Sequence, residues 1–95
     1  MPAPVPVSFS YQPPAALLRT WGFALFSAPP QQARYGRPSE RGQETVVLYE
    51  DGALMLFETV DGQLLYRFQG HVASEAEFRI LLRQVDWTAE GPVVP

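Results

Sequence analysis

Two Asp-Gly pairs divide the most β-rich stretch of the chain into three short runs of apolar and β-branched residues. The pairs lie at 51–52 and 61–62, ten residues apart. Asp-Gly readily adopts the positive φ angles of a type I′ turn, whose twist fits a tight antiparallel hairpin. The pattern therefore predicts a β-meander with strands near residues 44–50, 53–59 and 63–69.

Two-residue turns at both Asp-Gly pairs would fix the strand register and, with it, the two faces of the meander. One face is then apolar along its length and is expected to carry a helix: Val46, Leu48, Met55, Phe57, Leu64, Tyr66 and Phe68. The opposite face collects five large apolar side chains, Val47, Tyr49, Leu54, Leu56 and Leu65. A solvated sheet face normally alternates to polar residues. This second face is therefore expected to be covered, either by the N-terminal half of the chain or by another chain.

Residues 74–86 carry the pattern of an amphipathic helix. Ser74 and Glu77 have the spacing of a capping box, in which each side chain bonds a backbone N–H of the other residue. Apolar residues recur at helical spacing and form one stripe: Phe78, Leu81, Leu82 and Val85. The sequence therefore predicts a C-terminal helix that packs on the sheet.

The chain before the meander has two predicted elements. Residues 13–21 favour a short helix, because prolines suit its first turn and Gly22 can end it. A continuous strand over 17–27 is the alternative. Residues 1–12 alternate apolar and polar positions but are rich in proline. They form either a disordered tail or an extended arm docked on the domain or on a neighbour.

The connection over residues 28–43 is polar and holds a group of arginine and tyrosine side chains: Arg34, Tyr35, Arg37 and Arg41. Its prolines and glycines predict a long flexible loop. Such a loop is uncommon in a compact domain and is then either functional or disordered. Arginine beside tyrosine suits contact with an acidic partner surface, a phosphate or a stacked single-stranded base. A simple solvated loop is the alternative.

Composition limits the chemistry of the chain. Its 95 residues leave room for one domain, expected over 13–88 with a loose tail at 89–95. Cysteine is absent and histidine occurs once, which excludes disulfides, thiolate ligands and a multi-histidine zinc site within one chain. The formal net charge of −3 disfavours a general nucleic-acid binder, whose affinity depends on neutralising phosphates. Neither a cofactor nor a metal ion is expected.

His71 and Ser74 are the nearest approach to a base beside a nucleophile. Ser74 is better explained as the helix cap, and the sequence has no nucleophile elbow or phosphate-binding glycine loop. We therefore expect no catalytic residue. The longest apolar run, 15–28, contains an arginine and falls short of the roughly 20 residues that span a bilayer. With no recognisable signal peptide, a cytoplasmic protein is expected.

Together these patterns predict a small α+β protein, an antiparallel meander of three or more strands packed on a C-terminal helix, with a short N-terminal helix or edge strand. The expected function is that of a non-enzymatic interaction module, an accessory, regulatory or assembly factor that docks on a larger protein or on itself. The candidate contacts are the second sheet face and the arginine loop. The alternative is a structural subunit of a larger assembly such as a virion. A small enzyme and a binder of single-stranded nucleic acid are the weaker alternatives.

Overall fold

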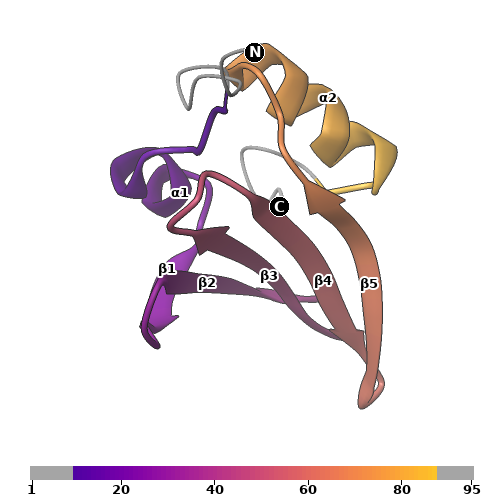
Figure 1. Cartoon of the computed structure of the whole chain (residues 1–95). Coiled ribbons are helices and arrows are strands. Elements are labelled where there is room, and N and C mark those ends of the chain that lie inside the picture. The colour runs from indigo at the N-terminus through magenta and orange to yellow at the C-terminus, as the bar shows by residue number, and fades with distance from the viewer. Residues whose placement is uncertain (1–9, 88–95) are drawn as a thin grey trace, which may run out of the picture.

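The computed structural model describes residues 10–87, in which two helices cover one side of a five-stranded antiparallel sheet (Figure 1). The elements in chain order are α1 (Ala15–Thr20), β1 (Ala24–Ser27), β2 (Gln32–Ser39), β3 (Gly42–Tyr49), β4 (Leu54–Val60), β5 (Gln63–Gly70) and α2 (Glu75–Gln84). The strands lie side by side in sequence order, so the sheet is a meander. The architecture is the small α+β domain that the sequence predicts.

The core lies between the helices and the inner face of the sheet, which is the face that α1 and α2 cover. The sheet contributes alternate strand residues to it: Tyr35, Val46, Leu48, Leu54, Leu56 and Phe68. The helices and their ends contribute Leu18, Trp21, Phe78, Leu81, Leu82 and Val85. The rings of Trp21 and Phe78 stack with their centroids 5.9 Å apart, and this contact joins the two helices directly.

Helix α2 begins where the capping box predicts. The Oγ of Ser74 accepts a hydrogen bond from the backbone N–H of Glu77 at 3.1 Å. This bond satisfies one of the donors that the first helical turn leaves free. Glu75 and Glu77 lie in the first turn and Arg83 in the last, which is the charge order that the helix dipole favours.

Both helices end in a Schellman motif, and the two motifs bring a pair of aromatic residues together. After α1, Gly22 has a φ of 90° and the N–H of Phe23 donates to the carbonyl five residues earlier at 2.9 Å. After α2, Asp86 has a φ of 62° and the N–H of Trp87 makes the equivalent bond at 2.8 Å. The residue after the left-handed position turns inward in this motif. The rings of Phe23 and Trp87 consequently lie 6.4 Å apart in the core.

The segment 28–43 is not the long loop that the sequence predicts, because most of it is strand β2. This strand pairs with β3 along its whole length, and a two-residue turn at 40–41 joins the two. Pro38 is tolerated because β1 pairs with β2 only as far as Gly36. The N–H that proline lacks therefore has no neighbouring strand to bond. Pairing with β3 outweighs a composition poor in β-branched residues.

The turn after β3 differs from the predicted two-residue turn. Of the first Asp-Gly pair only Gly52 has a positive φ, of 96°, whereas a type I′ turn needs both. The Oδ1 of Asp51 instead accepts a hydrogen bond from the N–H of Ala53 at 3.0 Å, and the connection spans residues 50–53. The pairing of β3 with β4 is therefore one residue out of the predicted register.

A shift of one residue exchanges the two faces of a strand, because successive side chains point to opposite sides of a sheet. Of the predicted second face, Leu54 and Leu56 lie on the inner face, fully buried under the helices. Val47 and Tyr49 lie on the opposite side, here called the outer face, and Leu65 is exposed on β5. The predicted helix-bearing face is divided likewise, with Met55, Phe57, Leu64 and Tyr66 on the outer face. The prediction is therefore wrong, because each of the two predicted sets of residues is divided between the inner and the outer face.

The second Asp-Gly pair forms the turn that the sequence predicts. Asp61 and Gly62 have φ angles of 51° and 81°, and Val60 pairs with Gln63 directly across the turn. The predicted pairs next to it are confirmed: Phe57 with Tyr66 and Thr59 with Leu64. The register of the β4–β5 hairpin beside its turn is thus set by local sequence.

The described part of the N-terminal segment is docked on the end of the sheet. The N–H of Tyr11 donates to the carbonyl of Val72 at 2.7 Å and forms an isolated antiparallel bridge. The Nε2 of Gln12 donates to the carbonyls of Tyr49 and Ala53 at 2.7 and 2.9 Å. Two backbone carbonyls at the ends of the β3–β4 connection are thus held by one side chain from a remote part of the sequence.

For the N-terminal segment the sequence predicts a short helix or an edge strand, and the structure contains one of each. The predicted helix over 13–21 is α1, followed by the short edge strand β1, so the alternative of one continuous strand over 17–27 is wrong. Of the arm predicted over 1–12, residues 10–12 are docked as described above. Its other residues and the tail predicted at 89–95 lie outside the described residues.

Candidate protein-interaction surface

The outer face of the sheet carries a group of apolar side chains that we call the outer patch: Phe26, Met55, Phe57, Leu64 and Tyr66. Three of them are large and well exposed, with 54% of Phe26, 49% of Leu64 and 68% of Tyr66 accessible to solvent. The patch draws on β1, β4 and β5, and both helices lie on the other side of these strands (Figure 1).

The centre of the patch is a cross-strand aromatic pair. Phe57 of β4 lies opposite Tyr66 of β5, and their ring centroids are 6.2 Å apart in a tilted arrangement. Such a pair stabilises a hairpin by about 0.2–1 kcal/mol. Tyr66 nevertheless keeps most of its surface in water, so the pair leaves a rigid aromatic group available for contact.

Phe26 reaches the outer face because of two local irregularities. A bulge between Leu25 and Ser27 interrupts the β1–β2 register. Gly36, the β2 residue beside it, has no side chain, and a Cβ at this position would lie 2.1 Å from the Gln43 Nε2 and 3.1 Å from the Phe26 ring. The glycine therefore leaves room for the ring to lie close to the sheet.

Val47 points to the outer face but has no accessible surface. It does not belong to the core cluster that the helices form with the inner face. Its cross-strand neighbours are Arg34 and Met55. The Nε of Arg34 donates to the Oε1 of Gln32 at 2.7 Å, which orients the guanidinium along the strand. Among the strand residues on this face, Arg34 carries the one formal charge.

The four residues predicted as an arginine site do not form one. Tyr35 and Arg37 point into the core and are only 9% and 3% exposed. Arg34 lies on the outer face, whereas the Arg41 guanidinium is at the β2–β3 turn, paired with the Asp61 carboxylate. Strand alternation separates these side chains, because a loop was expected where a strand formed.

Arg37 has a structural task. Its Nε lies 2.7 Å from the Oε1 of Glu44, the residue opposite on β3. Its Nη1 donates to the carbonyl of Trp21 at 2.7 Å, and its guanidinium lies 4.4 Å from the centroid of the Phe23 ring. The arginine thus ties the end of α1 to the sheet and satisfies a carbonyl that the helix leaves unpaired.

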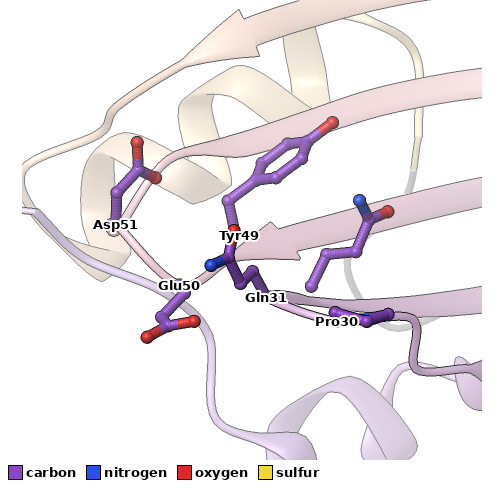
Figure 2. A pocket seen from close by; sticks show the side chains of 6 residues that line it. Pro30, Gln31, Tyr49, Glu50 and Asp51 are labelled. Carbon is purple, nitrogen blue, oxygen red and sulfur yellow. The ribbon is translucent and has the colours of Figure 1, made fainter.

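A shallow hollow of about 560 Å³ opens between the β1–β2 and β3–β4 connections. It is lined by Pro30, Gln31, Gln32, Tyr49, Glu50 and Asp51. Figure 2 shows the Glu50 and Asp51 carboxylates pointing in different directions. In residues 10–87 no three acidic or imidazole groups gather in a way that could hold a metal ion. The two carboxylates of the hollow therefore do not converge on one point.

His71 and Ser74 are placed as the sequence predicts for structural residues. His71 is exposed after β5, and the Ser74 hydroxyl is engaged by the helix N-terminus. The hydroxyl thus has the role that the sequence predicts for Ser74, as the acceptor that caps the helix.

Sequence reasoning missed the members of the outer patch, because it assigned Met55, Phe57, Leu64 and Tyr66 to the helix-bearing face. One signal could have corrected it. An aspartate that precedes glycine can bond the backbone N–H two residues later as an Asx turn, and Asp51 does so. Such a turn lengthens the connection and shifts the register.

Comparison of the chain with known protein families, curated proteins and solved structures gives no match. Within residues 10–87, neither helix is long and apolar enough to cross a bilayer. The fold and surface define a class, a small α+β domain whose meander has one face under helices and an apolar patch on the other.

Proposed function

We propose that the protein is a non-enzymatic protein-interaction module, an accessory, regulatory or assembly factor that docks through the outer patch. The exposure of Phe26, Leu64 and Tyr66 on one sheet face is the observation that carries this proposal. Large exposed apolar side chains gathered on one face are typical of sites of protein contact. Tyrosine is among the residues that contribute most to binding free energy.

The charge distribution supports a protein partner rather than a charged ligand. Interface centres are depleted of charged residues and enriched in aromatic ones. Arg34 is the single charge among the strand residues of the outer face, and Gln32 already holds it. Phosphate or nucleic acid would need several cations converging on one surface, and strand alternation disperses the arginines of β2.

The test compares two charge substitutions at apolar positions that are both more than half exposed. Tyr66→Glu alters the outer patch, and Ile80→Glu is the matched control, because Ile80 is 51% exposed on α2. Both variants should keep the native circular dichroism spectrum and a cooperative thermal transition. Quantitative co-purification from the native cells should show a stoichiometric partner with wild type and Ile80→Glu, and a loss of it with Tyr66→Glu. Equal recovery of all partners by Tyr66→Glu would refute the proposal.

A structural subunit of a larger assembly is the second candidate, and the sheet edges favour it. In the described part of the chain, β1 and β5 each pair with one strand only. A chain with two open edges can be joined on both sides, and contacts between unlike edges build rings or filaments. Sedimentation velocity distinguishes the candidates, because this one requires particles many times the mass of the 10.6 kDa chain.

A further inference from the structure

Strand β5 has a neighbouring strand on one side only among residues 10–87. It ends the sheet and pairs with β4 alone (Figure 1). Three consecutive residues on it are exposed: Leu64 by 49%, Leu65 by 40% and Tyr66 by 68%. An edge strand with free backbone groups and apolar side chains on both faces is a template for another strand.

The Asp61-Gly62 turn determines which backbone groups of β5 point outward. In a two-residue hairpin, the pair that closes the turn exchanges both of its backbone hydrogen bonds, and bonded and non-bonded pairs then alternate. Val60 and Gln63 are that closing pair. Gln63 and Leu65 consequently direct their N–H and C=O groups towards β4. Leu64 and Tyr66, between and beyond them, direct theirs to the free edge.

We propose that β5 pairs antiparallel with β5 of a second copy of this chain, with Leu65 on the twofold axis. Leu64 then lies opposite Tyr66 of the second copy, and Tyr66 opposite its Leu64. Both residues have outward-directed backbone groups, so these two pairs can exchange four hydrogen bonds. Leu65 meets Leu65 of the second copy as a non-bonded pair, where side chains approach more closely.

The faces of the strand agree with this register. Leu64 and Tyr66 lie on the outer face and Leu65 on the inner face. Opposed residues in an antiparallel pair point to the same side of the sheet, so each side chain meets one from its own face. All three exposed apolar residues are buried at once, and the outer patches of the two copies become continuous. The inference rests on the proposed function, since it names a second copy as the partner of the same surface.

Electrostatics permits a second copy despite the net negative charge of the chain. The only charge on β5 is Arg67, whose Nε lies 3.4 Å from the Oε1 of Glu58 and whose Nη2 bonds the Val85 carbonyl at 3.3 Å. In the proposed register the two copies of Arg67 lie about 14 Å apart along the strands, at about 3.4 Å per residue. Edge strands that avoid self-pairing usually carry lysine, proline or inward charges, and residues 63–66 carry none.

A bulge limits the length of the seam. The β4–β5 register shifts between Leu56 and Phe57, which makes Arg67 the extra residue of β5. A bulge disrupts regular pairing and bends the strand, so the seam is confined to the stretch before it. This selects Leu65 as the axis, because an axis at Tyr66 would place the bulge inside the paired segment.

The first experiment measures mass and removes one outward donor. Sedimentation equilibrium of the wild type should give twice the 10.6 kDa of the chain. Leu64→Pro removes an N–H directed to the free edge, where proline is tolerated, and should give a folded monomer. A monomeric wild type would overturn the inference. It would leave the proposed function standing if Tyr66→Glu still loses a different partner.

The second experiment tests the register, using the absence of cysteine from the chain. In Leu65→Cys the two Cα atoms would lie about 4.5 Å apart across the axis, within the range of a disulfide. Mild oxidation should convert this variant to a covalent dimer on a non-reducing gel. Leu64→Cys is the matched control and should stay monomeric on the gel. In the proposed register the two cysteines of this variant are offset by two residues along the strands and do not face each other. Equal cross-linking of both variants, or cross-linking of Leu64→Cys alone, would overturn the proposed pairing.

Discussion

Leu56 and Phe57 are neighbours in β4, yet they lie in opposite surroundings. Leu56 has no accessible surface and packs under two helices, whereas Phe57 lies on the outer face beside a tyrosine that is 68% exposed. Both side chains are large and apolar, so hydrophobicity alone does not say which one is covered. The difference teaches that the register decides the role of each residue: stability on the inner face, contact on the outer.

The largest effect is expected from a charge on the inner face. Leu56→Glu would place a carboxylate in an apolar core without a partner and should lose more than about 4 kcal/mol of unfolding free energy. Tyr66→Glu on the outer face should lose less than about 1 kcal/mol. Denaturant unfolding measures both. Similar losses for the two variants would show that the faces are not distinct.

The two faces can also be compared through a buried and an exposed ion pair. Arg37→Met leaves the Glu44 carboxylate, which is 15% exposed, without its cation and should cost about 3 kcal/mol. Arg41→Met is the matched control, because the Arg41–Asp61 pair is solvent-exposed and should cost less than about 1 kcal/mol.

A double variant, Arg37→Met with Glu44→Met, checks the cause of that loss. Removing both charges leaves no unpaired charge in the core and only the Trp21 carbonyl without its donor, so much of the stability should return. A double variant as unstable as Arg37→Met alone would show that the arginine acts through the Trp21 carbonyl and the Phe23 ring instead.

A smaller loss of stability is expected from a substitution at the N-terminus of α2. Ser74→Ala removes the hydroxyl that accepts from the Glu77 N–H and should lower the unfolding free energy by about 1 kcal/mol. Chemical denaturation measures the shift in midpoint. An unchanged midpoint would mean that this cap does not help to hold α2 over the inner face.

The smallest effect on stability depends on pH and concerns Tyr11, whose ring lies beside that of Phe78 in α2. Burial, and secondly the Glu75 carboxylate, raise the pKa of the Tyr11 phenol above its ordinary value of about 10. Because the folded pKa is the higher one, its stabilising contribution is complete below pH about 10 and is lost as the pH rises through the folded pKa. Tyr11→Phe should remove this dependence from unfolding curves. A variant with the same alkaline loss as wild type would contradict the assignment.

Elements with local determinants could be predicted from the sequence. The capping box marks the start of α2, and Asp61-Gly62 marks the β4–β5 turn and its adjacent pairs. In each case the groups that make the structure lie within a few residues of one another. Helix caps and tight turns of this kind depend little on the rest of the fold.

The candidate surface could not be predicted, because its determinants are distant. Gln12 bonds the carbonyls of Tyr49 and Ala53, residues 37 and 41 positions away. These bonds accompany the longer connection that shifts β3 against β4 and turns Phe57 outward. The prediction of an arginine loop was wrong for the same reason, since β2 is a strand through its pairing with β1 and β3.

The sequence by itself determined the fold class, the C-terminal helix and one hairpin turn, because short-range hydrogen bonds and apolar periodicity specify them. Only the tertiary structure decided which side of each strand faces the helices. Side chains alternate with a period of two, so a single extra residue in one connection inverts the faces of the residues after it, as far as the bulge at Arg67. That choice moved Leu54 and Leu56 into the core and left Leu64 and Tyr66 exposed on the outer face.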